Sequence, residues 1–152
     1  MKELADILGD PVFSGVYALQ TDTALSDLNR FLTGRGLAAF SVNGKHVRTK
    51  DRFLTAFAEA LQFPDYFGFN WDAFEDCLSD MSWHGSDGFS IIYDGFDVFL
   101  EHDPDEADTA LDILMDSAEY WRNEDRTFLV LLLEAGGIRR ELPAVRFHSD
   151  AH

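Results

Sequence analysis

The sequence predicts an α/β protein, in which a small parallel β-sheet is packed with α-helices. Two observations carry this prediction. Strand-like apolar runs alternate with helical patterns along the chain, and the run at residues 128–133 is apolar throughout. A continuously apolar strand is typical of a parallel sheet buried on both faces. Strands that alternate with helices form such a sheet through right-handed crossovers.

Four strands are expected, a first one from the N-terminal part of the chain and three in the core of the sheet: residues 12–19, 38–42, 89–93 and 128–133. Apolar residues at three- and four-residue spacings predict four helices: residues 23–33, 50–62, 71–80 and 105–121. At 152 residues the chain has the length of one compact domain.

Within that domain we expect an N-terminal strand–helix extension (1–37), a main α/β unit (38–135) and a C-terminal tail (136–152). The tail either adds a short edge strand at 144–147 or has no regular structure.

The charge of the chain is concentrated in its middle. The net charge is −16, yet 46% of the residues are hydrophobic, which excludes an acidic disordered protein. Residues 53–121 contain 17 Asp and Glu and no Lys or Arg, whereas acids and bases nearly balance on either side. Such a field repels nucleic acid and anionic membranes and attracts basic partners.

Cys77 is the only cysteine, so no intrachain disulfide can form. Neither a signal peptide nor an apolar run of membrane-spanning length is apparent. We expect a monomeric cytoplasmic protein that binds neither nucleic acid nor membranes.

The helix expected at 71–80 divides into an apolar and an acidic side. Asn70 is a suitable N-cap. Helical spacing puts five residues on the buried side: Trp71, Phe74, Cys77, Leu78 and Met81. The opposite side holds Asp72, Glu75, Asp76, Ser79 and Asp80. Asp72 complements the helix dipole, but aspartates four residues apart destabilise a helix by roughly 0.2–0.5 kcal/mol per pair.

Two interpretations of this acidic side are open. It is either a solvated face of an acidic protein or a surface on which carboxylates take the place of RNA phosphates. An arginine that binds phosphate can also make two hydrogen bonds to a carboxylate. The preceding loop, with Tyr66 and Phe69, adds aromatic residues of the kind enriched at interfaces. Phe67 in the same loop is expected to pack internally.

The segment Pro64-Asp-Tyr-Phe-Gly-x-Asn-x-Asp-Ala-x-x-Asp-Cys-Leu78 resembles the central motif of the barstar family, whose members inhibit barnase-type ribonucleases. The resemblance extends more weakly over about residues 38–133. It implies a small parallel sheet packed with helices and a non-enzymatic, cofactor-free bacterial protein. In the family, the loop and helix of this motif plug the active site of the ribonuclease.

Carried over by motif position, the resemblance implies contacts from Tyr66, Asn70, Asp72 and Asp76. Asp76 would mimic a substrate phosphate and accept hydrogen bonds from the catalytic arginine and histidine of the enzyme. Asp72 would pair with a base at the rim. A further acidic contact falls at Asp116, if no gap intervenes.

Three more residues complete the candidate surface: Phe69, Glu75 and Asp80. The sequence departs from the family at Glu75 and Met81, where barstar has tryptophans, and at Phe69, where barstar has an acid. These departures bear on which ribonuclease is bound.

The leading hypothesis is therefore an intracellular inhibitor that protects the producing cell, as an antitoxin or immunity protein. The alternatives are an immunity protein against another nuclease toxin, an acidic hydrolase that uses Asp72 and Asp76, and a structural or adaptor domain.

A calcium loop at 102–108 is disfavoured because the required glycine is missing. Asp103, Pro104 and Glu106 are better explained as a helix start with a capping box. The five histidines lack zinc-ligand spacing, so no metal is expected.

Overall fold

The computed structural model describes residues 1–81, 88–136, 138 and 141–148. Its centre is a sheet of six strands, all parallel, in the order β1-β6-β2-β5-β4-β3. The strands are β1 (Lys2–Glu3), β2 (Gly15–Thr21), β3 (Ala38–Asn43), β4 (Gly88–Asp94), β5 (Thr127–Leu132) and β6 (Ala144–Phe147). The predicted α/β class is confirmed, with two strands more than the four expected.

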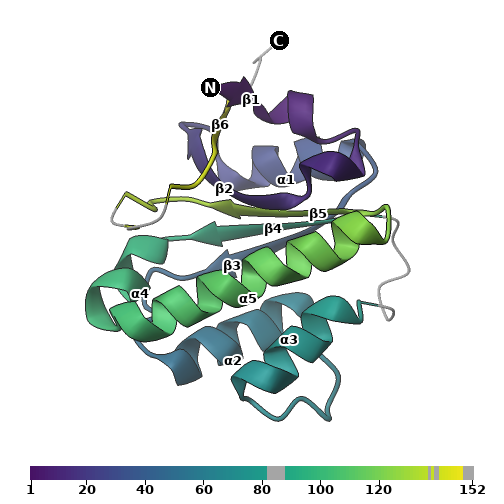
Figure 1. Ribbon diagram of the computed structural model, residues 1–152. Coiled ribbons are helices and arrows are strands. Elements are labelled where there is room, and N and C mark those ends of the chain that lie inside the picture. The colour runs from purple at the N-terminus through teal and green to yellow at the C-terminus, as the bar shows by residue number, and fades with distance from the viewer. Residues whose placement is uncertain (82–87, 137, 139–140, 149–152) are drawn as a thin grey trace.

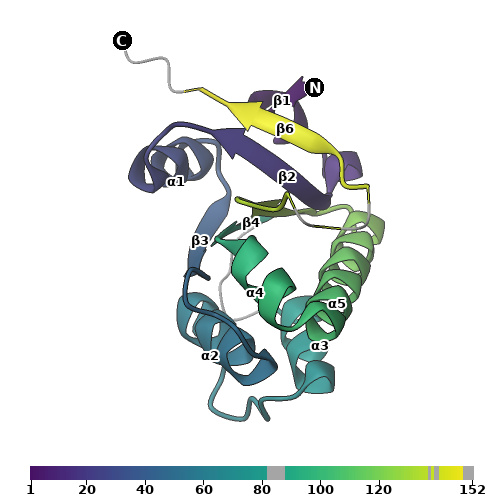
Figure 2. The same cartoon turned by 90° about the vertical axis from the view of Figure 1, so that its left-hand side faces the viewer.

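Helices cover both faces of this sheet (Figures 1 and 2). The helices are α1 (Leu25–Gly34), α2 (Lys50–Leu61), α3 (Trp71–Ser79), α4 (Phe96–His102) and α5 (Pro104–Asn123), with two 3-10 helices, η1 (Leu4–Ile7) and η2 (Pro11–Phe13). On one face lie α2, α3, α4 and α5, and on the other lie α1 and η1 (Figure 1). No helix in the described part of the chain is both long and apolar enough to cross a membrane.

The two faces of the sheet explain the apolar run at the end of the main unit. All six residues of β5 are buried. Phe128, Val130 and Leu132 pack against the α2–α5 side, while Leu129 and Leu131 pack against the α1 side. A strand with period-two side chains can be apolar throughout only when both faces are covered, as they are here.

The N-terminal part contains more structure than one strand and one helix. The strand expected from residue 12 begins at Gly15, because Asp10 and Pro11 first start η2. The Asp10 carboxylate accepts a hydrogen bond from the Val12 amide at 3.0 Å. An Asp N-cap followed by Pro is a local signal for the start of a helix, and it cannot be recognised from the spacing of apolar residues alone.

The C-terminal tail returns to the sheet as β6. It pairs with β2 on one side and with the two residues of β1 on the other, so it is not the outermost strand. The alternative of an irregular tail is therefore wrong for residues 144–147. Arg146 also pairs with Glu3 at 2.6 Å, which links β6 to β1.

The entry into α5 differs from the expected capping box. Asp103 is the N-cap residue and Pro104 is the first helical residue, but the Asp103 side chain makes no capping hydrogen bond. The Glu106 carboxylate instead accepts a hydrogen bond from the Trp71 indole at 2.7 Å. The short helix α4, which immediately precedes Asp103, was not expected.

Gly44 is expected to tolerate no side chain without a loss of stability, because it follows β3 in contact with the buried Tyr93 ring. A Cβ atom at Gly44 would overlap the ring of Tyr93. Gly44→Ala should therefore lower the free energy of unfolding by about 1–3 kcal/mol, as overpacked cores do. Urea denaturation of the variant and the wild type measures this difference.

Tyr93→Phe is the matched control for the same contact. The Tyr93 hydroxyl is buried and has no hydrogen-bond partner among the described residues, and its burial raises the pKa of the phenol. Removing the hydroxyl should change the free energy of unfolding by less than about 1 kcal/mol. Equal stabilities of Gly44→Ala and the wild type would show that the backbone moves freely away from Tyr93.

Candidate functional site

The acidic helix α3 begins at the predicted N-cap. The Asn70 side-chain oxygen accepts a hydrogen bond from the Ala73 amide at 2.8 Å, and Asn70 itself is extended (φ −134°). The apolar side is buried as expected, with Phe74, Cys77 and Leu78 within the helix. Trp71 is only half-buried. The N-cap and the buried side fix which residues of α3 face the solvent.

Four carboxylates lie on that solvent face. Asp72, Glu75, Asp76 and Asp80 are all exposed. In the part of the chain that the structure describes, none of them forms a salt bridge. The surface they form is therefore exposed and negatively charged, and Arg126 is the cation that lines the hollow beside Asp80.

The loop before α3 presents two aromatic side chains to the solvent. Phe67 is buried and its amide donates to the Pro64 carbonyl oxygen at 2.9 Å, which closes a turn. On either side of it, Tyr66 is 73% exposed and Phe69 is 53% exposed. Phe69 has a positive φ of 52°, and its ring rests on Phe67 at 4.7 Å between centroids. Phe67 thus packs internally, as predicted, while Tyr66 and Phe69 are exposed to solvent.

The Asp80 carboxylate acts electrostatically on Tyr66, which lies 14 positions earlier in the chain. Partial desolvation, and then the negative charges of Asp80 and Cys77, raise the pKa of the Tyr66 phenol. An ordinary tyrosine phenol is protonated at neutral pH, and this shift acts in the same direction, so Tyr66 can donate a hydrogen bond. The aromatic loop is therefore within electrostatic reach of the C-terminal end of α3.

Two tryptophans attach α3 to α5, and this was not apparent from the sequence. The Trp71 indole donates to Glu106 in the first turn of α5. From the other helix, the buried Trp121 indole donates to the Leu78 carbonyl oxygen at 2.8 Å. The helices lie side by side (Figure 1) and are joined at both ends of α3. The orientation of the acidic face is therefore fixed before any partner binds.

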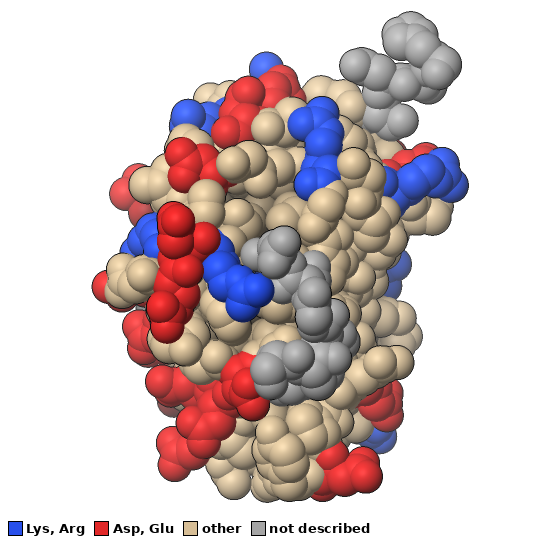
Figure 3. All heavy atoms as spheres, turned by 90° about the vertical axis from the view of Figure 1, so that its right-hand side faces the viewer, with Lys and Arg blue, Asp and Glu red and all other residues tan. Residues whose placement is uncertain are grey.

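The outer side of α5 continues the acidic surface. Asp105, Asp112, Asp116 and Glu119 are exposed on this helix. Carboxylates gather over the lower part and left edge of the face in Figure 3, the side toward which α3 and α5 lie. Asp116 occupies the solvent side of α5 and lines a hollow toward β2. No direct contact joins Asp116 to the carboxylates of α3 within the described residues.

A second hollow of about 450 Å³ lies where the ends of α3 and α5 meet. It is lined by Ser79, Asp80, Tyr120, Glu124 and Arg126, together with the edge of Trp121. Tyr120 is 42% exposed and was not among the predicted residues. Its position four residues after Asp116, on the same side of the helix, was the signal that could have identified it.

Cys77 is expected to be unreactive, because it belongs to the buried side of α3. Burial, followed by the charges of Asp76 and Asp80, raises the pKa of its thiol and so lowers the fraction of reactive thiolate. At pH 8, disulfide exchange with an aromatic disulfide reagent should be at least about 100-fold slower in the folded protein than in urea, since the thiol must await a local opening. Equal rates would mean that α3 is not packed as described.

Among the described residues, no group of three or more His, Cys, Asp or Glu side chains is arranged to hold a metal ion. The two candidate catalytic aspartates, Asp72 and Asp76, stand on an exposed helix surface. Fold and surface together define a parallel α/β protein with an exposed aromatic loop and a pair of acidic helices.

Residues 37–133 match a family described as barstar (barnase inhibitor). The match spans more than half of the chain, which belongs to the barstar family. Members of this family are inhibitors of barnase-type ribonucleases rather than enzymes. A comparison with curated proteins gave no match. The family match begins at residue 37 and ends at residue 133, so it does not include β1, β2, α1 or β6.

Proposed function

We propose that the chain binds a basic ribonuclease and occludes its active site with the aromatic loop, α3 and the adjoining side of α5. The observation that carries this proposal is the state of the α3 carboxylates. They are exposed, without salt bridges in the described part of the chain, and carried by a helix that two tryptophans attach to α5. A preorganised surface of one charge loses little entropy on binding a complementary surface.

Asp76 and Asp72 have different roles in this complex. Asp76 lies on the middle turn of α3, where its carboxylate replaces an RNA phosphate and accepts hydrogen bonds from the catalytic arginine and histidine of the ribonuclease. Asp72, at the first turn, pairs with a base at the rim of the active site. Charge-assisted hydrogen bonds of this kind are short and strong when water is excluded.

Four further side chains surround these aspartates. Tyr66 donates a hydrogen bond and Phe69 packs against the enzyme, while Glu75 and Asp80 contact basic residues beside the active site. Asn70 caps α3 and so orients Asp72. Asp116 extends the acidic contact onto α5. The acidic field of the whole surface increases the rate of encounter with a basic enzyme.

In the cell, such a complex keeps a toxic ribonuclease inactive in the cytoplasm of the producing bacterium. The same surface would serve an immunity protein against a different nuclease toxin. A hydrolase that uses Asp72 and Asp76 is disfavoured because enzyme sites are concave and exclude water, whereas these side chains are exposed on a helix.

Titration of the protein into a panel of basic ribonucleases, including barnase, tests the proposal. RNA cleavage by at least one enzyme should fall linearly with added protein and stop at one equivalent. An acidic ribonuclease serves as the control and should keep its activity. Full activity of every basic ribonuclease at a large excess of the protein would overturn the proposal.

A further inference from the structure

A shallow groove separates α5 from the N-terminal part of the chain. It has a volume of about 390 Å³. One wall is formed by Met115, Asp116 and Glu119 of α5, inside the family match, and the other by Val12, Tyr17 and Pro143, outside it. Because Asp116 belongs to this groove, the groove adjoins the acidic surface proposed to bind the ribonuclease.

The N-terminal wall is held rigidly in place by Ser14. The Ser14 hydroxyl donates to the Arg126 carbonyl oxygen at 2.9 Å and accepts from the Phe128 amide at 3.0 Å. The Arg122 guanidinium, from the last turn of α5, donates to the Ser14 carbonyl oxygen at 3.0 Å. These three bonds connect η2 to α5 and β5, so the groove is preformed.

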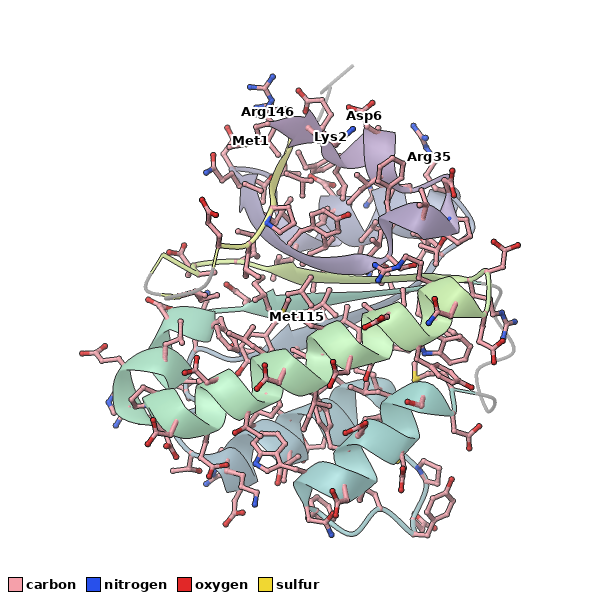
Figure 4. The ribbon with its side chains drawn as sticks, viewed as in Figure 1. Met1, Lys2, Asp6, Arg35, Met115 and Arg146 are labelled. Atoms are coloured by element: carbon pink, nitrogen blue, oxygen red, sulfur yellow. The ribbon has the colours of Figure 1, made fainter. Side chains whose placement is uncertain are left out.

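The groove contains two of the large apolar side chains that the described surface exposes. Val12 is 58% exposed and Met115 is 39% exposed. Figure 4 shows Met115 on α5, whereas the exposed Met1 lies at the far end of the molecule beside Lys2 and Arg146. The other exposed apolar side chains, Tyr66, Phe69 and Tyr120, lie around α3. Exposed apolar side chains therefore lie on both sides of the acidic helices.

We propose that this groove receives an apolar side chain of the ribonuclease, so that the N-terminal part of the chain contributes directly to partner binding. Asp116 and Glu119 line the groove together with one cation, Arg122, whose guanidinium is bound to the Ser14 carbonyl oxygen. The remaining negative charge favours an apolar residue that is flanked by lysine or arginine, which a basic enzyme offers. This inference rests on the proposed function. It assigns to residues outside the family match a part in recognition that the barstar-type motif does not supply.

Binding kinetics of Val12→Ser and Met115→Ser test the inference, with barnase or the ribonuclease that the wild-type protein inhibits most strongly. Each substitution should raise the dissociation rate about 5- to 30-fold, as loss of an apolar anchor does. The association rate should change little, because charge is unaltered. Val98→Ser, an apolar-to-serine change on α4, is the matched control and should leave both rates unchanged. Urea denaturation checks that all three variants remain folded.

The outcomes separate this inference from the function on which it rests. If Asp76→Ala weakens binding while both groove variants behave like Val98→Ser, the inference is wrong and the proposed function stands. If the wild-type protein binds no basic ribonuclease, both are wrong. If the chain alone is a dimer in sedimentation and the groove variants make it a monomer, the groove binds a second copy, which also overturns the inference.

Discussion

Asp76→Ala is expected to raise the dissociation constant for the ribonuclease by roughly 30-fold to several thousand-fold. This corresponds to about 2–5 kcal/mol, the cost of truncating one partner of a buried, hydrogen-bonded charge pair. Much of that cost arises because the catalytic arginine of the enzyme would remain buried without a counter-charge. Isothermal titration calorimetry of the wild type and the variant measures the difference.

Glu59→Ala is the matched control for this effect. Glu59 is exposed on α2, so its removal changes the net charge equally but leaves α3 intact. We expect its dissociation constant to lie within about threefold of the wild-type value, because an isolated surface charge contributes little. Similar losses for both variants would mean that net charge alone, and not the position of Asp76, determines binding.

Phe53→Ala is expected to give the largest loss of stability, about 3–5 kcal/mol. Phe53 is fully buried on α2, and its ring lies within 6 Å of the rings of five residues: Phe57, Trp71, Phe74, Tyr93 and Phe99. Trp71 and Phe74 belong to α3, so the cavity left by Phe53→Ala would weaken the packing of the helix that carries the acidic surface. Urea denaturation should show a lower midpoint, and ribonuclease inhibition should weaken in the same variant.

Phe69→Ala provides the comparison for Phe53→Ala. The Phe69 side chain is half-exposed, and the ring that it contacts in the described part of the chain, Phe67, belongs to the same loop. Its removal should cost less than about 1 kcal/mol of stability. If Phe53→Ala also lost less than about 1 kcal/mol of stability, the packing described for α2 and α3 would be wrong.

The part of the site that lies on α3 could be predicted because its signals are local. A capping residue, Asn70, and a three- and four-residue spacing determine both the start of the helix and the side that is buried. The exposure of Asp72 and Asp76 follows from the same spacing. The α/β class could likewise be predicted from β5, whose uninterrupted apolar residues require cover on two faces.

Other features depend on contacts between distant residues and have no local signal. The hydrogen bond from Trp121 to Leu78 joins positions 43 residues apart. The position of β6 between β1 and β2 brings the last strand of the sheet beside the first. The groove beside Asp116 exists because Ser14 binds residues more than 100 positions away. Periodicity cannot predict such contacts, because each requires the tertiary fold.

Competition with a substrate analogue tests the central claim most directly. A short fluorescent deoxyoligonucleotide, which a ribonuclease binds without cleaving, occupies the active site while the protein is added. If α3 and its loop fill that site, the protein should displace the oligonucleotide at one equivalent, and Asp76→Ala should need a much higher concentration. A stable ternary complex of ribonuclease, oligonucleotide and protein would contradict occlusion of the active site.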